Sequence, residues 1–235
     1  MIQGNAQDYD QIAKVARVYN SVTDEYDTAY RLKRCIAEDD LIRREILKLS
    51  AHGVADLGCG SGLGYELVDA SPSYVGIDIS SGMIAKARAK FPRGTWRVAD
   101  ACHTGLASSS YGLIMSLYGC ISYVSDLDAL FREIRRLIRP YGQYFLVDYT
   151  PRCRGREGAL MPPLSSHLWH DRTEAEIWLA ATRNNLTAEI RSLNRYVDLV
   201  PEWMPQWTHN ALIRAEWALG TKGGYYTIVR GNGKT

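Results

Sequence analysis

The hydrophobic pattern of the first fifty residues is helical. Apolar residues recur among charged ones every three to four positions, which predicts helices at residues 8–20 and 32–50. The connection between them, residues 19–30, is polar and rich in tyrosine. We therefore expect residues 1–50 to form a separate N-terminal helical segment.

From residue 52 onward, short apolar runs alternate with amphipathic stretches. The apolar runs predict strands at residues 53–58, 73–80, 94–100, 111–119 and 142–150. The amphipathic stretches predict helices at residues 63–70, 81–91 and 126–138. Strands that alternate with helices indicate an α/β fold, in which helices cover both faces of a parallel sheet.

The last third of the chain has a different pattern. Residues 151–170 carry Pro, Gly and Ser without periodicity, so we expect a loop or a small insertion there. Asp171 or Thr173 can cap the helix that follows, because each has a glutamate three residues on. We then expect a helix at 173–185, a strand at 186–200, a helix at 209–220 and a strand at 223–231. Residues 51–235 are predicted to form one domain, with a second insertion around 201–222.

A glycine-dense turn, DLGCGSGLG at residues 56–64, joins the first predicted strand to the first helix of the sheet. The dinucleotide-binding pattern G-x-G-x-x-G/A is not met, because Leu63 and Tyr65 stand where its two frames need a third small residue. The turn is D-x-G-x-G-x-G, from Asp56 to Gly62. A carboxylate before the turn would repel a pyrophosphate, but it would accept hydrogen bonds from an ammonium group.

The turn resembles motif I of the class I S-adenosylmethionine-dependent methyltransferases. Four further segments resemble the later motifs of that family in order and spacing: residues 75–87, 98–103, 111–124 and 134–148. At residues 140–142 the chain has Pro-Tyr-Gly, where the family usually has Pro-Gly-Gly. The resemblance covers about residues 50–150. It implies a doubly wound, Rossmann-like sheet of about seven strands, mostly parallel with an antiparallel last strand.

The resemblance also implies S-adenosylmethionine as cofactor and a role for each matching residue. Asp78 would receive the two ribose hydroxyls, since a carboxylate can accept from both. The turn and one residue of the fourth strand would bind the methionyl end: Asp56, Gly58, Cys59, Gly60 and Leu117. Ile79 and Met83 would pack on the adenine, and Asp100 and Ala101 would make polar contacts with it. Tyr26 would fold over the site, with Tyr19 as second choice. The N-terminal helices and the region after residue 151 would form a lid on the substrate side.

Methyl transfer to oxygen often needs a base, and transfer to an amine with a free lone pair does not. His170 in the loop after the fifth strand is a candidate base, with His167 as an alternative, and both could equally be surface residues. Asp148 ends the fifth strand and could hold the substrate or make a structural hydrogen bond. Tyr118 would lie at the boundary between cofactor and substrate. We expect no metal site, because the H-x-x-H pair has no further His or Cys cluster nearby.

Aromatic residues gather in the second half of the chain. A set of them could wall a pocket for a planar or cationic substrate, or could simply pack in the core: Trp169, Trp203, Trp207, Tyr118, Tyr123 and Tyr149. Three arginines in the run PRCRGREG could contact an anionic substrate group or lie in solvent: Arg152, Arg154 and Arg156.

The composition of the chain limits the kinds of molecule that the protein is expected to bind. A net charge of +2 and a pI near 8.2 are not typical of nucleic-acid binding. Five widely spaced cysteines without C-x-x-C argue against a disulfide framework, and the N-terminus does not resemble a signal peptide. We expect a cytoplasmic monomer or homodimer that acts on a small molecule, without nucleic acid or membrane.

Two alternatives stay open on the sequence. A nucleic-acid methyltransferase is disfavoured, because the fourth strand ends in SLYG rather than in an Asn/Asp-Pro-Pro-Tyr-type motif. A non-catalytic protein that binds S-adenosylmethionine is the other alternative.

Overall fold

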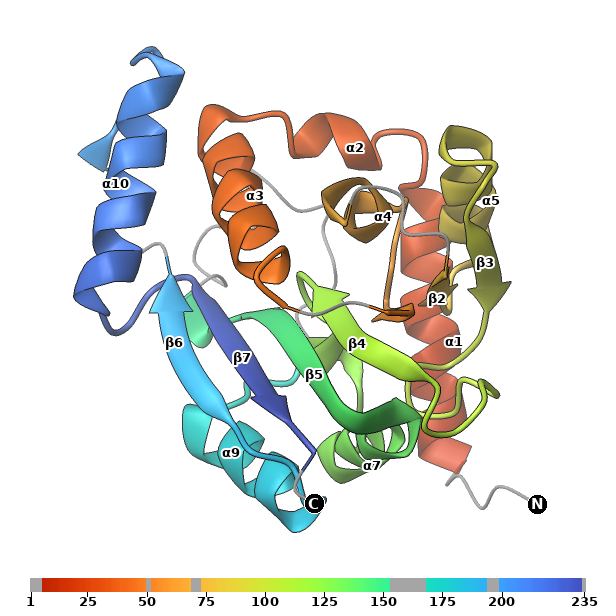
Figure 1. Ribbon diagram of the computed structural model, residues 1–235. Coiled ribbons are helices and arrows are strands. Elements are labelled where there is room, and N and C mark those ends of the chain that lie inside the picture. Colours follow the sequence, from red (N-terminus) through yellow and green to blue (C-terminus); the bar gives the residue numbers. More distant parts are fainter. Residues whose placement is uncertain (1–5, 50–51, 69–72, 153–167, 194–198, 234–235) are drawn as a thin grey trace.

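The computed structural model describes residues 6–49, 52–68, 73–152, 168–193 and 199–233. A seven-stranded sheet with the order β3-β2-β1-β4-β5-β7-β6 runs through the molecule (Figure 1). Five strands are parallel, and β7 is antiparallel to both of its neighbours, β5 and β6. The strands are β1 Val54–Leu57, β2 Tyr74–Asp78, β3 Thr95–Val98, β4 Tyr111–Leu117, β5 Ile138–Tyr149, β6 Glu189–Leu193 and β7 Tyr226–Asn232. The predicted doubly wound sheet with an antiparallel last strand is confirmed.

Helices cover both faces of the sheet. They are α1 Ala6–Ser21, α2 Tyr26–Ala29, α3 Lys33–Ile46, α4 Leu63–Leu67, α5 Ser81–Lys90, α6 Cys120–Tyr123, α7 Leu127–Leu137, α9 Glu174–Arg183 and α10 Gln206–Leu219. On one face α3 packs beside α10, and on the other α7 packs beside α9 (Figure 1). Helix α1 lies against α5. No helix in the described part of the chain is long and apolar enough to cross a membrane.

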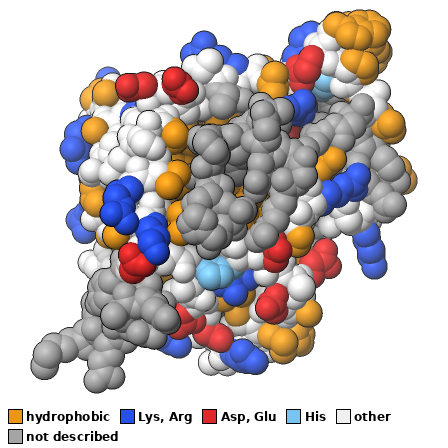
Figure 2. Space-filling view, turned by 180° about the vertical axis from the view of Figure 1, so that it is seen from behind, with side chains coloured by type: hydrophobic (Ala, Val, Ile, Leu, Met, Phe, Trp, Pro, Cys, Tyr) orange, Lys and Arg blue, Asp and Glu red, His pale blue; other side chains and the backbone are white. Residues whose placement is uncertain are grey.

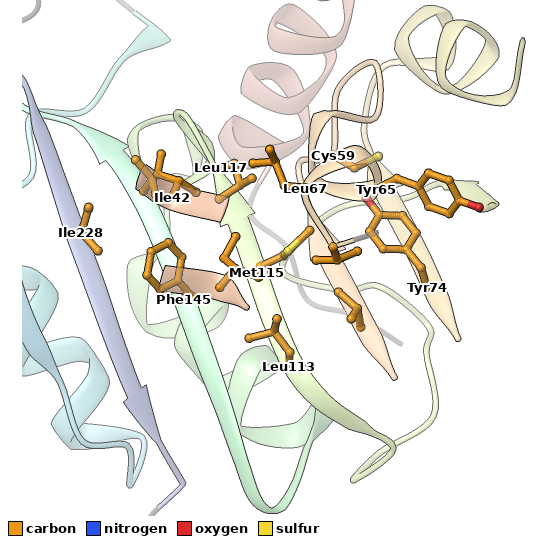
Figure 3. Packing of buried hydrophobic residues seen from close by; sticks show 14 of the residues in the cluster. Ile42, Cys59, Tyr65, Leu67, Tyr74, Leu113, Met115, Leu117, Phe145 and Ile228 are labelled. Atoms are coloured by element: carbon orange, nitrogen blue, oxygen red, sulfur yellow. The ribbon is translucent and has the colours of Figure 1, made fainter. Parts of the chain in front are cut away.

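The period-2 pattern of the strands produces two cores. Leu113 and Met115 of β4 point to the face that α3 covers, where Ile42 and Phe145 pack (Figure 3). Ile114, between them in sequence, points to the opposite core beneath α7. Neighbouring strands keep this alternation in step, which fixes the register of their pairing. Because β1 to β4 are parallel, their carboxyl ends meet at one edge of the sheet.

The structure differs from the predicted elements at three places. Strand β5 begins directly after α7, and residues 139–142 bulge out opposite Gly112, with Tyr141 at φ 61°. Helix α10 begins at Gln206, earlier than the predicted 209. The short helices α2 and α6 were not predicted, because four residues carry no usable periodicity.

Thr173 caps α9 in a full capping box with Glu176, so of the two predicted caps Thr173 is correct and Asp171 is not. Of the strand expected at 186–200, residues 189–193 form β6, and residues 194–198 lie outside the described part.

Candidate functional site

A cavity of about 260 Å³ lies at the carboxyl ends of β1 to β4. This is the switch point of the sheet, because β1 is flanked by β2 on one side and by β4 on the other. Strand ends supply Gly58, Asp78 and Tyr118, and the loop after β3 supplies Asp100. Helix α1 closes the opposite side, and Tyr26 of α2 joins it.

Asp78 is the best fixed of the predicted residues in this cavity. The backbone N–H of Gly60 donates to Oδ2 at 2.8 Å, and that of Ser80 donates to Oδ1 at 2.8 Å. Burial raises the pKa of Asp78, and these two N–H donors oppose the rise. Each oxygen keeps a further lone pair for a ligand, so the carboxylate is oriented in advance to receive two hydroxyls.

Asp100 stands at the next strand end. Its Oδ1 accepts from the Cys102 N–H at 2.9 Å, and its Oδ2 lies 3.1 Å from His103 Nδ1. Both Asp100 and His103 line the cavity, together with Ala101. Among the described lining residues there are three aspartates, Asp78, Asp100 and Asp126, and one basic residue of the Lys or Arg type, Arg132. The lining is therefore acidic.

The glycines of the turn serve two different needs. Gly58 lines the cavity at φ 73°, and a Cβ there would lie 3.1 Å from the Cys120 Cβ. At Gly64 a Cβ would lie 2.1 Å from the Asp56 Oδ2. The first glycine lets the backbone border the cavity, and the second makes room for a carboxylate of the protein itself.

The structure does not bring Asp56 to the cavity. Its side chain is 1% exposed and accepts a hydrogen bond from the Tyr74 hydroxyl at 2.6 Å, whereas Oδ1 has no partner among the described residues. Burial raises the pKa of Asp56 to about 7. Of the two ways in which Asp56 could accept from an ammonium group, the geometry does not support direct contact, and a contact through water stays a prediction.

The other predicted cofactor residues divide into two groups. Tyr26, Ile79 and Ala101 line the cavity beside Gly58, Asp78 and Asp100. The remaining ones lie outside the lining: Cys59, Gly60, Met83 and Leu117. The Gly60 N–H donates to the Asp78 carboxylate, and Met83 is fully buried. These roles remain predictions, and the structure brings only the first group directly to the cavity.

Helix α1 is tied to the sheet by polar contacts at its C-terminal end. Asn20 Oδ1 accepts from the Gly82 N–H at 2.9 Å and from the Ser80 hydroxyl at 2.7 Å. Asp27 accepts from the Ser61 hydroxyl at 2.5 Å and from Lys90 at 3.1 Å. The N-terminal segment thus closes over the cavity through bonds to the motifs that line it.

Tyr118 borders the cavity with its backbone in the left-handed region, at φ 64°. Its hydroxyl donates to Asp39 Oδ1 of α3 at 2.8 Å. Burial raises the pKa of Asp39 to about 6. The sequence did not single out Asp39, because one acid in a charged helix carries no local signal.

His170 and Asp148, the other predicted catalytic residues, do not line the cavity. His170 Nε2 lies 2.6 Å from the Gln11 Nε2, and Gln11 does line it. Burial, with the charge of Arg172, lowers the pKa of His170. Asp148 is fully buried, and its Oδ2 accepts from the Ser122 hydroxyl at 2.8 Å. Burial raises the pKa of Asp148 to about 7.

Of the six aromatic residues that could wall a pocket or pack in the core, Tyr118 and Tyr123 line the cavity. Trp169 is buried against Tyr123 and Tyr149, with ring centroids 6.3 and 5.1 Å away. Trp203 and Trp207 are 78% and 70% exposed near the start of α10, so they neither line the cavity nor pack in the core. Figure 2 shows apolar side chains gathered at its upper right corner.

The arginine run and the H-x-x-H pair, for which no metal site is expected, lie partly outside the described residues. Arg152 donates to the Gly223 carbonyl at 2.7 Å and stacks on Tyr225. His167, Arg154 and Arg156 lie outside the described residues. No group of three or more potential metal ligands occurs within the described ranges.

Comparison with known proteins adds to this geometry. Residues 54–142 match the methyltransferase domain family. The chain is 32% identical over 142 residues to a malonyl-[acyl-carrier protein] O-methyltransferase of Methylovorus sp., covering 55% of this chain and 48% of that protein. It is 28% identical over 161 residues to a ubiquinone/menaquinone biosynthesis C-methyltransferase of Campylobacter jejuni, covering 60% and 66%. The match thus spans about half to two thirds of these relatives.

The fold has a solved counterpart. A S-adenosylmethionine-dependent methyltransferase of Thermotoga maritima, described as a possible histamine N-methyltransferase, superposes with a TM-score of 0.68 at 13% identity over 92% of this chain and 98% of that one. At that identity the similarity concerns the fold alone. Residues 54–142 thus match a methyltransferase domain, and both the related sequences and the shared fold are similar to those of methyltransferases.

Proposed function

We propose that this protein transfers the methyl group of S-adenosylmethionine to a nitrogen or oxygen atom of a small-molecule acceptor. The observation that carries the proposal is the pair of carboxylates, Asp78 and Asp100, at consecutive strand ends of one cavity. An acidic lining suits a cofactor with a positive charge. A carboxylate already held by two backbone N–H groups suits a ribose diol.

The residues of the chain would hold the cofactor and prepare the site. Asp78 would bind the ribose hydroxyls, and Asp100, Ile79 and Ala101 would surround the adenine. When bound, S-adenosylmethionine supplies a methyl group already activated by its sulfonium. The protein then has to orient the acceptor and exclude water. Helix α1 and Tyr26 cover the cavity and are placed for that exclusion.

The acceptor atom is the finer part of the proposal. The curated relatives are named for transfer to oxygen and to carbon, so they do not decide it. A nucleic-acid acceptor has less support, because the cavity is acidic and a phosphate backbone would be repelled.

Calorimetry with S-adenosylhomocysteine tests the cofactor site. Asp78→Ala should weaken binding by roughly 10- to 100-fold, the range for losing charge-assisted hydrogen bonds. Asp128→Ala on α7 is the control, since Asp128 pairs with Arg183 of α9 and is not among the residues that line the cavity. Equal affinity of the Asp78 and Asp128 variants would contradict the ribose assignment, and production of S-adenosylhomocysteine from an acceptor panel would test transfer.

A further inference from the structure

Six aromatic side chains form a closed cluster beside the cavity. We call it the aromatic cluster: Tyr19, Tyr26, Tyr30, Tyr123, Tyr149 and Trp169. The rings contact one another in the order Tyr30, Tyr26, Tyr19, Tyr123, Trp169 and Tyr149. The centroids of each contacting pair lie between 5.0 and 6.3 Å apart. Hydrogen bonds of Tyr30 to Tyr26 and Tyr149 close the circuit.

The cluster reaches the wall of the cavity at Gly119. A Cβ at this residue would lie 2.7 Å from the Tyr149 Cε2 and 3.4 Å from the Tyr123 Cε2. Glycine, at φ 116°, lets the Tyr149 ring approach the backbone that follows β4. Gly119 and Tyr123 themselves line the cavity, as do Tyr19 and Tyr26, so the aromatic cluster borders it.

Two more rings lead from the cluster to a carboxylate. Tyr149 contacts Tyr226 at 5.6 Å, and Tyr226 contacts Tyr118 at 5.4 Å. The Tyr118 hydroxyl donates to Asp39. Within the described ranges this is the only hydrogen bond of the Asp39 side chain, and Asp39 has no ion pair there. A half-buried carboxylate without a cation is costly, and a bound cation would offset that cost.

We propose that the cavity wall formed by Tyr19, Tyr26, Tyr118 and Tyr123, with Asp39 behind Tyr118, is the acceptor subsite and takes a small amine. This inference rests on the proposed function. Aromatic faces and a carboxylate both stabilise positive charge on nitrogen.

Amine methylation is the reaction that creates such a charge. An ammonium acceptor first releases its proton to solvent. The nitrogen lone pair then forms the new N–C bond while the C–S bond breaks and its electron pair stays on sulfur. Positive charge moves onto the nitrogen during this step, so a subsite that stabilises it lowers the barrier as well as binding the amine. An oxygen acceptor would gain no such help from these groups.

The test uses a charged probe and its neutral isostere on the complex with S-adenosylhomocysteine. The probes are choline and 3,3-dimethylbutan-1-ol, which differ in one nitrogen and its charge. We expect choline to bind about tenfold or more tightly, as followed by ligand-observed NMR with calorimetry. Asp39→Asn should reduce this preference to about threefold or less. Asp40→Asn, whose carboxylate pairs at the surface with Arg44 and Arg214, should keep it.

Tyr226→Leu gives a second variant that removes a ring and leaves Asp39 in place, should Asp39→Asn not fold. It should reduce the preference for choline as well. If S-adenosylhomocysteine binds but the two probes bind alike, or choline shows no binding, the amine subsite is overturned and the cofactor site stands. If S-adenosylhomocysteine itself does not bind to the wild-type protein, both proposals fail.

Discussion

At the scale of single residues, the role expected for Asp56 differs most from its position in the structure. The motif implied a carboxylate that meets the cofactor, and the folded chain instead places it under the glycine turn beside Tyr74. An acid whose pKa is raised to about 7 in the folded state opposes folding when it is charged. The stability that the protonated Asp56 contributes is fully present below the unfolded pKa of about 4, and it is lost as the pH rises through about 7.

We therefore predict that Asp56→Asn gains stability relative to the wild type as the pH rises from 4 to 8. The gain should be on the order of a few kcal/mol at most, and chemical denaturation at several pH values measures it. Asp24→Asn, at an exposed position, serves as the control. Affinity for S-adenosylhomocysteine should stay within about threefold of the wild type, and a large loss would return Asp56 to the cofactor site.

His170 is the second residue whose predicted role changes. It contacts the cavity only through Gln11, and its lowered pKa keeps it neutral at pH 7. We predict that His170→Ala changes kcat by less than about tenfold and leaves the shape of the pH–rate profile between pH 6 and 8 unaltered. Disappearance of an ionisation from that profile would show that His170 acts as a base.

At the scale of elements, helix α1 closes the cavity and is held there by few bonds. Asn20 alone accepts two hydrogen bonds from the segment that follows β2. The helix also packs against α5, and Gln11 donates to the Tyr123 and Leu168 carbonyls, so side-chain contacts rather than sheet pairing hold it in place. A covering element of this kind is expected to open more readily than the sheet.

Asn20→Ala should accordingly speed the release of S-adenosylhomocysteine by roughly three- to thirtyfold, since it removes two hydrogen bonds worth about 1 kcal/mol each. Stopped-flow displacement measures the rate. Lys14→Ala, on the same helix and paired with Asp10 in solvent, should leave it unchanged. An unaltered release rate in Asn20→Ala would mean that α1 is not the barrier to exit.

At the scale of the whole molecule, the sheet and the two carboxylates at its strand ends could be predicted from the sequence because their signals are local. Alternation of strands with helices predicts the parallel sheet, and Asp78 and Asp100 lie in short segments that resemble family motifs, each at a predicted strand end. Asp39 and Gln11 could not be found this way, since they reach the site from helices far away in the chain. Trp203 and Trp207 were misplaced for the related reason that aromatic content does not reveal burial.

The exposed pair permits a prediction about the molecule as a whole. Trp203→Ser combined with Trp207→Ser should shift the Tm by less than about 3 °C and leave the binding of S-adenosylhomocysteine intact, because substitutions at exposed positions cost little. Differential scanning fluorimetry and calorimetry measure both. Weaker cofactor binding would show that this corner reaches the site after all.

The position of β7 has a consequence for how the protein is made. Strand β6 is synthesised before β7, yet it can join the sheet only through β7, which lies between β6 and β5. On the ribosome, the nascent chain therefore carries an unpaired edge at β5 until residues 226–232 have emerged. Tyr226 arrives with that strand and completes the ring contacts to Tyr118 and Tyr149. A partly synthesised chain could thus assemble the parallel half of the sheet while it still lacks this side of the site.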